Sequence, residues 1–194
     1  MWKYSEILMD HFMNPRNAGE LDNPDGHSEV GSPQCGDAMT LDIKVDDDDR
    51  ISDIRFMTFG CAGAIAAASA LTEIAKGLTL EEAKGIKNSQ IVKFLGGMPA
   101  EKYHCSVMGH DALSDAINNF ITKRDAIAVA IKDILAENPG KLRSILGDRT
   151  IRIEHVHPGR IRISNVDANR QKVTEILEKE LHDRTGSTVE VRID

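Results

Sequence analysis

The feature that most constrains the fold is a pair of strand-like segments joined by four consecutive aspartates. Apolar residues occupy every second position of Met39–Val45, which is the period of a strand with one buried face. A second strand is expected from about Ile51 to Phe59, and Asp46–Asp49 supplies the turn of a hairpin. Residues Gly60–Gly63 then open an alanine-rich helix that continues to about Lys76. The chain therefore combines an antiparallel hairpin with helices.

Further helices are expected on both sides of the hairpin. Their expected ranges are Tyr4–Met13, a segment beginning at Thr79, a segment from Asn88 that ends at Gly96, and His104–Arg124. Between the first helix and the hairpin, the chain up to Asp37 is rich in Gly, Pro, Asn and Asp, so we expect a loop there.

A domain boundary is expected near Lys123–Asp125, dividing the chain into residues 1–124 and 125–194. The second part has no cysteine and is predicted to be a small α-β-β-α-β domain. Its expected elements are Ala126–Ala136, Thr150–Val156, Arg160–Ser164, Ala168–His182 and Thr188–Ile193.

The negative charge of the chain belongs to its first part. The formal net charge is −7; residues 1–124 contain 12 Lys or Arg and 19 Asp or Glu, and residues 125–194 contain 12 of each. An acidic surface repels nucleic acid phosphates and suits a basic protein partner, so no nucleic acid is expected. The longest apolar stretch, near Ala62–Leu71, is too short to span a bilayer, and the charged N-terminus is unlike a signal peptide. We expect a cytoplasmic protein with no membrane partner.

The three cysteines all lie in the first part, each at a position suited to a ligand. Cys35 falls in a loop rich in Gly and Pro, Cys61 at a strand-to-helix junction, and Cys105 beside His104 near a helix start. Backbone N–H groups at a helix N-terminus favour a thiolate and lower its pKa. An odd number of cysteines also fits a reducing compartment, where thiols act as ligands or nucleophiles.

Three thiolates are one short of the four ligands usual for a cluster or a zinc ion. The nearest candidates for the missing ligand are Asp37 and His104. A hard carboxylate matches iron bound to soft sulfide poorly, so a cluster held partly by Asp37 should be labile. A free cysteine is more often a small buried apolar residue, and no C-x-x-C is present. Taken alone, these residues indicate a thiolate metal site and nothing more specific.

The short sequence motifs around these residues resemble those of one family. Met1–Arg124 resembles the U-type iron–sulfur scaffolds, meaning IscU and the N-terminal domain of NifU. The matching pieces are Asp10-His11, Asn14–Asn17, Gly36-Asp37 after Cys35, Phe59–Cys61, Lys84–Asn88 and His104–Ser106.

This resemblance implies an α+β domain whose small antiparallel sheet is covered by helices. It implies a scaffold, not an enzyme, that takes sulfur from a cysteine desulfurase, acquires iron, assembles a [2Fe-2S] cluster and passes it to apo-proteins. By motif position, Cys35, Cys61 and Cys105 would hold the cluster, with Asp37 keeping it labile and His104 as an additional or alternative ligand. Cys105 would accept the incoming sulfur, and zinc would bind the same residues when no cluster is present. The spacing from Cys61 to Cys105 leaves no room for the insertion of the SufU branch.

Two segments depart from the family pattern. Met98–Lys102 stands where IscU proteins carry Leu-Pro-Pro-Val-Lys for an Hsp70-type chaperone, and its acid Glu101 argues against dependence on that chaperone. Residues 125–194 resemble the C-terminal module of NifU in topology only, since Ser164–Asp167 stands where that module has cysteines. We expect this part to serve docking or homodimer formation.

Two other functions remain open from the sequence. In the first, Cys35, Asp37, Cys61 and Cys105 hold zinc in a sulfurtransferase that carries a persulfide. In the second, the chain is a regulator that senses clusters, with a basic group on its second domain formed by Arg149, Arg152, Arg160 and Arg162.

Overall fold

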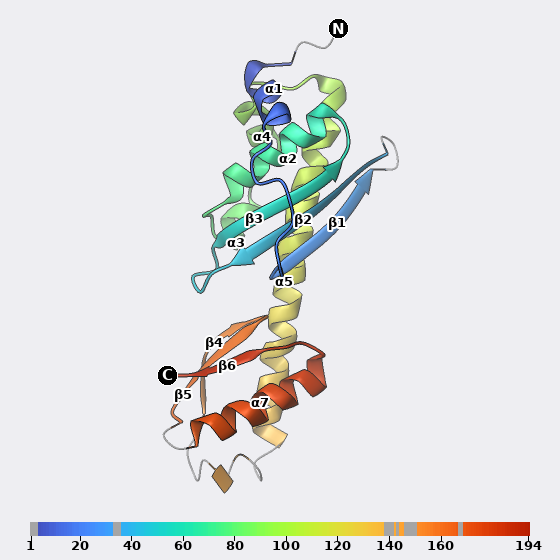
Figure 1. Cartoon of the computed structure of the whole chain (residues 1–194). Helices are drawn as coiled ribbons and strands as arrows, with labels where there is room; N and C mark the ends of the chain where they lie inside the picture. The colour runs from blue at the N-terminus through green and yellow to red at the C-terminus, as the bar shows by residue number, and fades with distance from the viewer. Residues whose placement is uncertain (1–3, 33–35, 138–141, 143, 146–150, 167–168) are drawn as a thin grey trace. The chain divides into compact units, whose positions relative to one another are not determined.

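The computed structural model describes residues 4–32, 36–137, 142, 144–145, 151–166 and 169–194 (Figure 1). The chain divides into two compact units, Met1–Asn119 and Phe120–Asp194, and each has its own three-stranded sheet. Whether residues 1–124 and 125–194 act as separate functional domains stays a prediction. Within the described ranges, no helix is both long and apolar enough to cross a membrane.

The first sheet contains the predicted hairpin. Strands β1 (Gly26–Ser32), β2 (Asp37–Val45) and β3 (Ile51–Phe59) are antiparallel and lie in the order β1-β2-β3. The aspartate run forms the turn, because Oδ1 of Asp46 accepts hydrogen bonds from the backbone N–H groups of Asp48 (3.0 Å) and Arg50 (2.9 Å).

Helices cover one face of this sheet (Figure 1). They are α1 (Glu6–Met13), α2 (Ala62–Ala75), α3 (Leu80–Lys84), α4 (Asn88–Phe94), the short 3-10 helix η1 (Ala100–Lys102) and the start of α5 (Tyr103–Glu137). Ten of the 14 residues of α2 are buried, so its small alanine side chains let neighbouring elements approach closely on several sides. The α+β fold of this unit is confirmed.

The expected loop before Asp37 was wrong in one part, because Gly26–Ser32 forms β1. This segment lacks the alternation that marks a strand from sequence, and it is held instead by polar contacts with α5. The Ser28 hydroxyl donates a hydrogen bond to the carbonyl of Ala112 (2.7 Å). A Cβ at Gly26 would lie 2.3 Å from the carbonyl oxygen of Ala116, so the strand approaches α5 too closely for any side chain there.

The two helices expected at His104–Arg124 and Ala126–Ala136 are one continuous helix, α5, and the expected break is wrong. The sequence around Lys123–Asp125 contains no glycine or proline, so nothing there interrupts the backbone hydrogen bonds. The division between the two units falls inside this helix.

The second unit has the predicted α-β-β-α-β order. Strands β4 (Arg152–His157) and β5 (Arg160–Ser164) are antiparallel, and α7 (Arg170–Thr185) leads to β6 (Glu190–Ile193), which pairs parallel with β5. Its core joins the end of α5, β5 and α7, with Ile131, Ile161, Ile163 and Leu177 fully buried. Arg160 and Arg162 alternate with these buried isoleucines and so lie on the opposite face of β5, whereas Arg149 lies outside the described residues.

His11 links α1 to α2 and gives this fold a pH dependence. The Ser69 hydroxyl oxygen accepts a hydrogen bond from the backbone N–H of Arg16 (2.8 Å) and lies at hydrogen-bond distance, 2.8 Å, from His11 Nδ1. Burial lowers the pKa of His11 below its ordinary 6.5, and the charge of Arg16 adds to this, while Glu73 and Asp10 act in the opposite direction.

Because the folded pKa is depressed, the unfolded chain binds more protons below pH 6.5, and the free energy of unfolding should fall as the pH drops below that value. Urea unfolding of the wild type at pH 7.5 and 5.5 should show this loss, and His11→Gln should show less of it. An equal loss in both proteins would contradict the assignment to His11.

Candidate metal centre

Asp37 begins β2, and the sheet register brings it to the end of β3. Ala38 pairs with Phe59, so the next position places Asp37 across from Gly60. A Cβ at Gly60 would lie only 2.9 Å from Cγ of Asp37, so glycine leaves the room that the carboxylate occupies. Asp37 is 7% exposed, and its Oδ2 has no hydrogen-bond partner among the described residues. A buried oxygen without a partner costs free energy, which indicates that it serves a ligand.

Cys61 is the N-cap residue of α2, directly after β3. This position at a strand-to-helix junction is the one expected from the sequence. The Cys61 side chain makes no capping hydrogen bond, and its Sγ lies 3.6 Å from Sγ of Cys105. The hairpin and the start of α2 therefore bring the Cys61 thiol to the end of the sheet where the Asp37 carboxylate lies.

His104 and Cys105 lie in the first turn of α5. A ring nitrogen of His104, Sγ of Cys105 and a carboxylate oxygen of Asp37 all lie within 4.8 Å of one another. With Cys61 beside Cys105, four of the five predicted ligand side chains converge from three separate parts of the chain. The fifth, Cys35, lies outside the described residues.

The Cys105 thiol is fully buried, and this controls its charge. Burial raises the pKa of Cys105 to about 12, with further contributions from the hydrogen bond and charge of Cys61 and from the charge of Asp37. In the metal-free protein, Cys105 is therefore protonated at neutral pH. A bound cation would deprotonate this thiol, so binding at this site should release a proton.

Sequence reasoning does not single out Lys102 as a site residue, but the structure places it beside the thiols. The negative charge of a Cys61 thiolate is the largest cause that raises the Lys102 pKa, and Cys105 adds to it. A Cβ built on Gly63 would lie 3.6 Å from both Cys61 Sγ and Lys102 Cβ, which places both residues next to Gly63. The available signal was the position of Lys102 three residues before Cys105.

Lys102→Met should therefore make Cys61 less reactive, because the ammonium group no longer favours the thiolate. The rate of Cys61 alkylation by iodoacetamide at pH 8 should fall about threefold to tenfold, because the positive charge beside the reacting sulfur is lost. Peptide mass mapping of the time course would measure it, with Lys93→Met on the exposed side of α4 as the matched control. An unchanged rate in Lys102→Met would remove Lys102 from the site.

Comparison with known proteins identifies the first part of the chain. The profile of the NifU-like N terminal domain matches residues 3–127. Iron-sulfur cluster assembly scaffold protein IscU 1 of Archaeoglobus fulgidus is 51% identical over 124 residues, which cover 64% of this chain and 80% of that protein. IscU of Escherichia coli K12 is 48% identical over 126 residues, covering 63% of this chain and 98% of that protein. Nitrogen fixation protein NifU of Azotobacter chroococcum is 50% identical over 121 residues, which cover 62% of this chain but 39% of that protein.

Solved structures agree with this result. The structure of a SUF-system cluster assembly scaffold protein from Fervidobacterium islandicum superposes with a TM-score of 0.52 at 26% identity, covering 59% of this chain and 96% of that one. The family profile spans more than half of the chain and includes all three cysteines. The chain therefore belongs to the NifU-like N-terminal domain family.

Proposed function

We propose that this protein is a scaffold on which a [2Fe-2S] cluster is assembled from iron and sulfur and then transferred to apo-proteins. The observation that carries the proposal is the convergence of Cys61, Cys105, Asp37 and His104 at one site, where Asp37 and Cys105 are buried and the other two are half-buried. The IscU relatives that are 51% and 48% identical to this chain over the aligned residues are named as cluster assembly scaffolds, which supports the same role.

The ligand chemistry fits a cluster that is bound and then released. Cys61 and Cys105 supply soft thiolates, and we propose that Cys35 supplies the third. Asp37 offers a hard oxygen that competes poorly for iron bound to sulfide, so its bond should open first when an acceptor arrives. His104, within reach of both Asp37 and Cys105, is proposed as the additional ligand that replaces it.

Cys105 is the proposed acceptor of sulfur from a cysteine desulfurase. Its thiolate would attack the terminal sulfur of the desulfurase persulfide, forming a new S–S bond at Cys105 and releasing the desulfurase thiolate. Since the resting thiol is buried with its pKa raised to about 12, this step requires deprotonation, which iron bound at the neighbouring ligands would favour. The chemistry is a transient transfer on a carrier, with no catalytic turnover of its own.

Its partners would be a cysteine desulfurase and apo-protein acceptors, and its place would be the cytoplasm. Residues 125–194 are proposed as a docking or homodimer module, and we propose no dependence on an Hsp70-type chaperone, because Glu101 alters its recognition segment.

A second candidate is a zinc-bound sulfurtransferase. The described site by itself offers two sulfurs, one nitrogen and one oxygen, which is the number of donors that zinc takes in a tetrahedral site. A sulfurtransferase of this kind needs no cluster, and zinc would then occupy the site in the resting protein.

Anaerobic reconstitution separates the two. The protein would be incubated with ferrous iron, cysteine and a cysteine desulfurase, followed by visible absorption with iron and sulfide analysis, and then mixed with an apo-ferredoxin. A cluster that forms and moves to the ferredoxin is the expected result. Zinc that stays bound under these conditions, with no cluster formed, would favour the sulfurtransferase. A cluster that forms and is retained would contradict the transfer function.

A further inference from the structure

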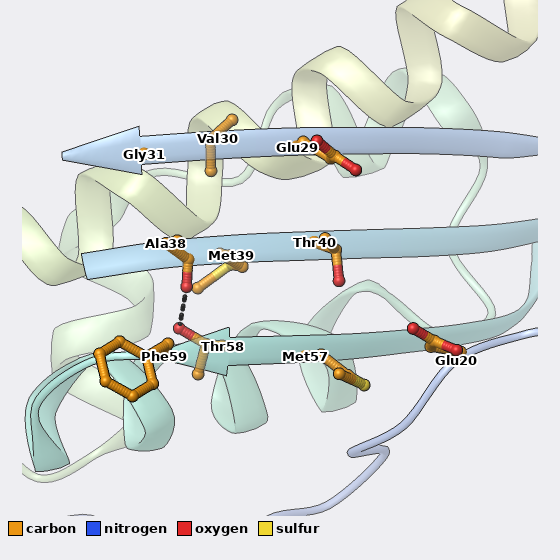
Figure 2. Close-up of a pocket in the computed structure, with 10 residues that line it drawn as sticks. All are labelled: Glu20, Glu29, Val30, Gly31, Ala38, Met39, Thr40, Met57, Thr58 and Phe59. Atoms are coloured by element: carbon orange, nitrogen blue, oxygen red, sulfur yellow. Dashed lines mark hydrogen bonds between the residues drawn. The ribbon is translucent and has the colours of Figure 1, made fainter. Parts of the chain in front are cut away.

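The first sheet carries an open hollow of about 660 Å³ on the face turned away from the helices (Figure 2). Its floor is formed by the central strand β2, where Ala38 and Thr40 have small side chains. Ala38 pairs with Phe59, and Thr40 pairs with both Glu29 of β1 and Met57 of β3. Residues two apart on a strand share a face, so Met57 and Phe59 form one apolar wall along β3.

This wall is unusually exposed for apolar side chains. Phe59 is 82% exposed and Met57 is 49% exposed. Single exposed apolar residues are common, but two neighbours on one face beside a hollow form the kind of patch that marks a protein contact. Aromatic residues and methionine are also enriched at protein interfaces.

Acidic side chains bound the hollow on both sides. Glu29 stands on β1, and Glu20 follows the segment that pairs with the outer edge of β3 through Ala18 and Phe56 (Figure 2). The Glu29 side chain is 77% exposed and lies 3.6 Å from the ring of His27. With strands about 4.8 Å apart, the two acids are separated by roughly 10–15 Å across the sheet.

The two acidic side chains beside the hollow favour one class of binding partner over another. The first unit of a second copy would bring another acidic surface against the hollow, since residues 1–124 carry 19 Asp or Glu against 12 Lys or Arg. A basic segment with an apolar side chain between two cations would match both the apolar wall and the acids.

We propose that this hollow is a docking face for a basic protein partner, which places an apolar side chain against Met57 and Phe59 and cations at Glu20 and Glu29. Phe59 lies two residues before Cys61, and Ala38 follows Asp37, so the partner would dock next to the metal centre. The inference concerns a surface and does not depend on which metal or cluster the centre holds.

The test uses the full chain and two blocked pentapeptides, Lys-Leu-Phe-Leu-Lys and Glu-Leu-Phe-Leu-Glu. In NMR titrations, the lysine peptide should shift the backbone amides of Thr40, Met57 and Phe59, and the glutamate peptide should bind at least fivefold more weakly. The double variant Met57→Ser/Phe59→Ser, and separately Glu20→Gln/Glu29→Gln, should each weaken binding of the lysine peptide at least fivefold. Phe94→Ser, which removes an apolar side chain 41% exposed on α4, is the matched control and should leave the affinity unchanged.

Shifts that map elsewhere on the acidic surface, or equal affinity for the two peptides, would overturn the proposal. Sedimentation velocity tests whether a second copy of the chain occupies the hollow. Self-association that depends on concentration and disappears in Met57→Ser/Phe59→Ser would assign the face to a second copy and also overturn it. The serine variants change exposed positions, and circular dichroism would verify their fold.

Discussion

Cys105→Ser is expected to weaken zinc binding by the cluster-free protein by about 100-fold or more, since loss of even an outer-shell partner costs about 10–100-fold. The substitution removes the thiol that lies 3.6 Å from Cys61 and within 4.8 Å of the ligand atoms of Asp37 and His104. A serine hydroxyl keeps its proton near neutral pH and is a poor ligand for zinc or iron beside sulfide. Competition titration against a chromophoric chelator would measure the loss, and reconstitution should yield no stable cluster.

The matched control for Cys105→Ser is Val107→Ser, two residues further along α5. Val107 is 41% exposed and contributes no ligand atom, so its replacement should change the zinc affinity less than twofold. If Cys105→Ser keeps wild-type affinity while Val107→Ser also does, then Cys105 is a buried apolar residue and not a ligand.

Asp37→Ala is expected to slow cluster release, by about tenfold or more in the half-time of transfer to an apo-ferredoxin. The reason is that the oxygen ligand proposed at Asp37, which would bind iron most weakly of the set, would be replaced by a firmer one from His104 or an added thiol. The same variant removes a buried carboxylate whose Oδ2 has no described hydrogen-bond partner, so its free energy of unfolding should not decrease. Stopped-flow absorption and urea unfolding would measure the two effects separately.

Asp111→Ala, at an exposed position on α5, serves as the control for Asp37→Ala and should transfer its cluster at the wild-type rate. Faster cluster loss from Asp37→Ala than from the wild type would show that Asp37 holds the cluster and does not keep it labile.

The hairpin could be predicted because its information is local. Alternation in Met39–Val45 and the aspartate turn are properties of neighbouring residues, and the structure keeps both. β1 could not be predicted in this way, because it is held by backbone pairing with β2 and by the contact of Ser28 with Ala112 of α5, 84 positions further along the chain.

The candidate site, too, could be predicted only where its information is local in the sequence. The residue types and the positions of Cys61 and Cys105 beside helix starts follow from the sequence, and the hairpin register places Asp37 near Cys61. The meeting of these residues with His104 requires tertiary packing of α5 against the sheet. The approach of Lys102 to Cys61 requires it too, and the local signal for it is limited to the position of Lys102 three residues before Cys105.

The continuity of α5 has a consequence for shortening the chain. The helix begins with His104 and Cys105, and its far end buries Ile127, Ile131 and Ile134 in the second unit. A protein ending at Glu137 would keep these isoleucines and lose the strands and helix that cover them. The exposed apolar stripe would promote aggregation. A stop codon after Asn119 would avoid the stripe, because the second unit begins at Phe120. The suitable truncation site therefore lies inside a helix and not in a loop between secondary-structure elements.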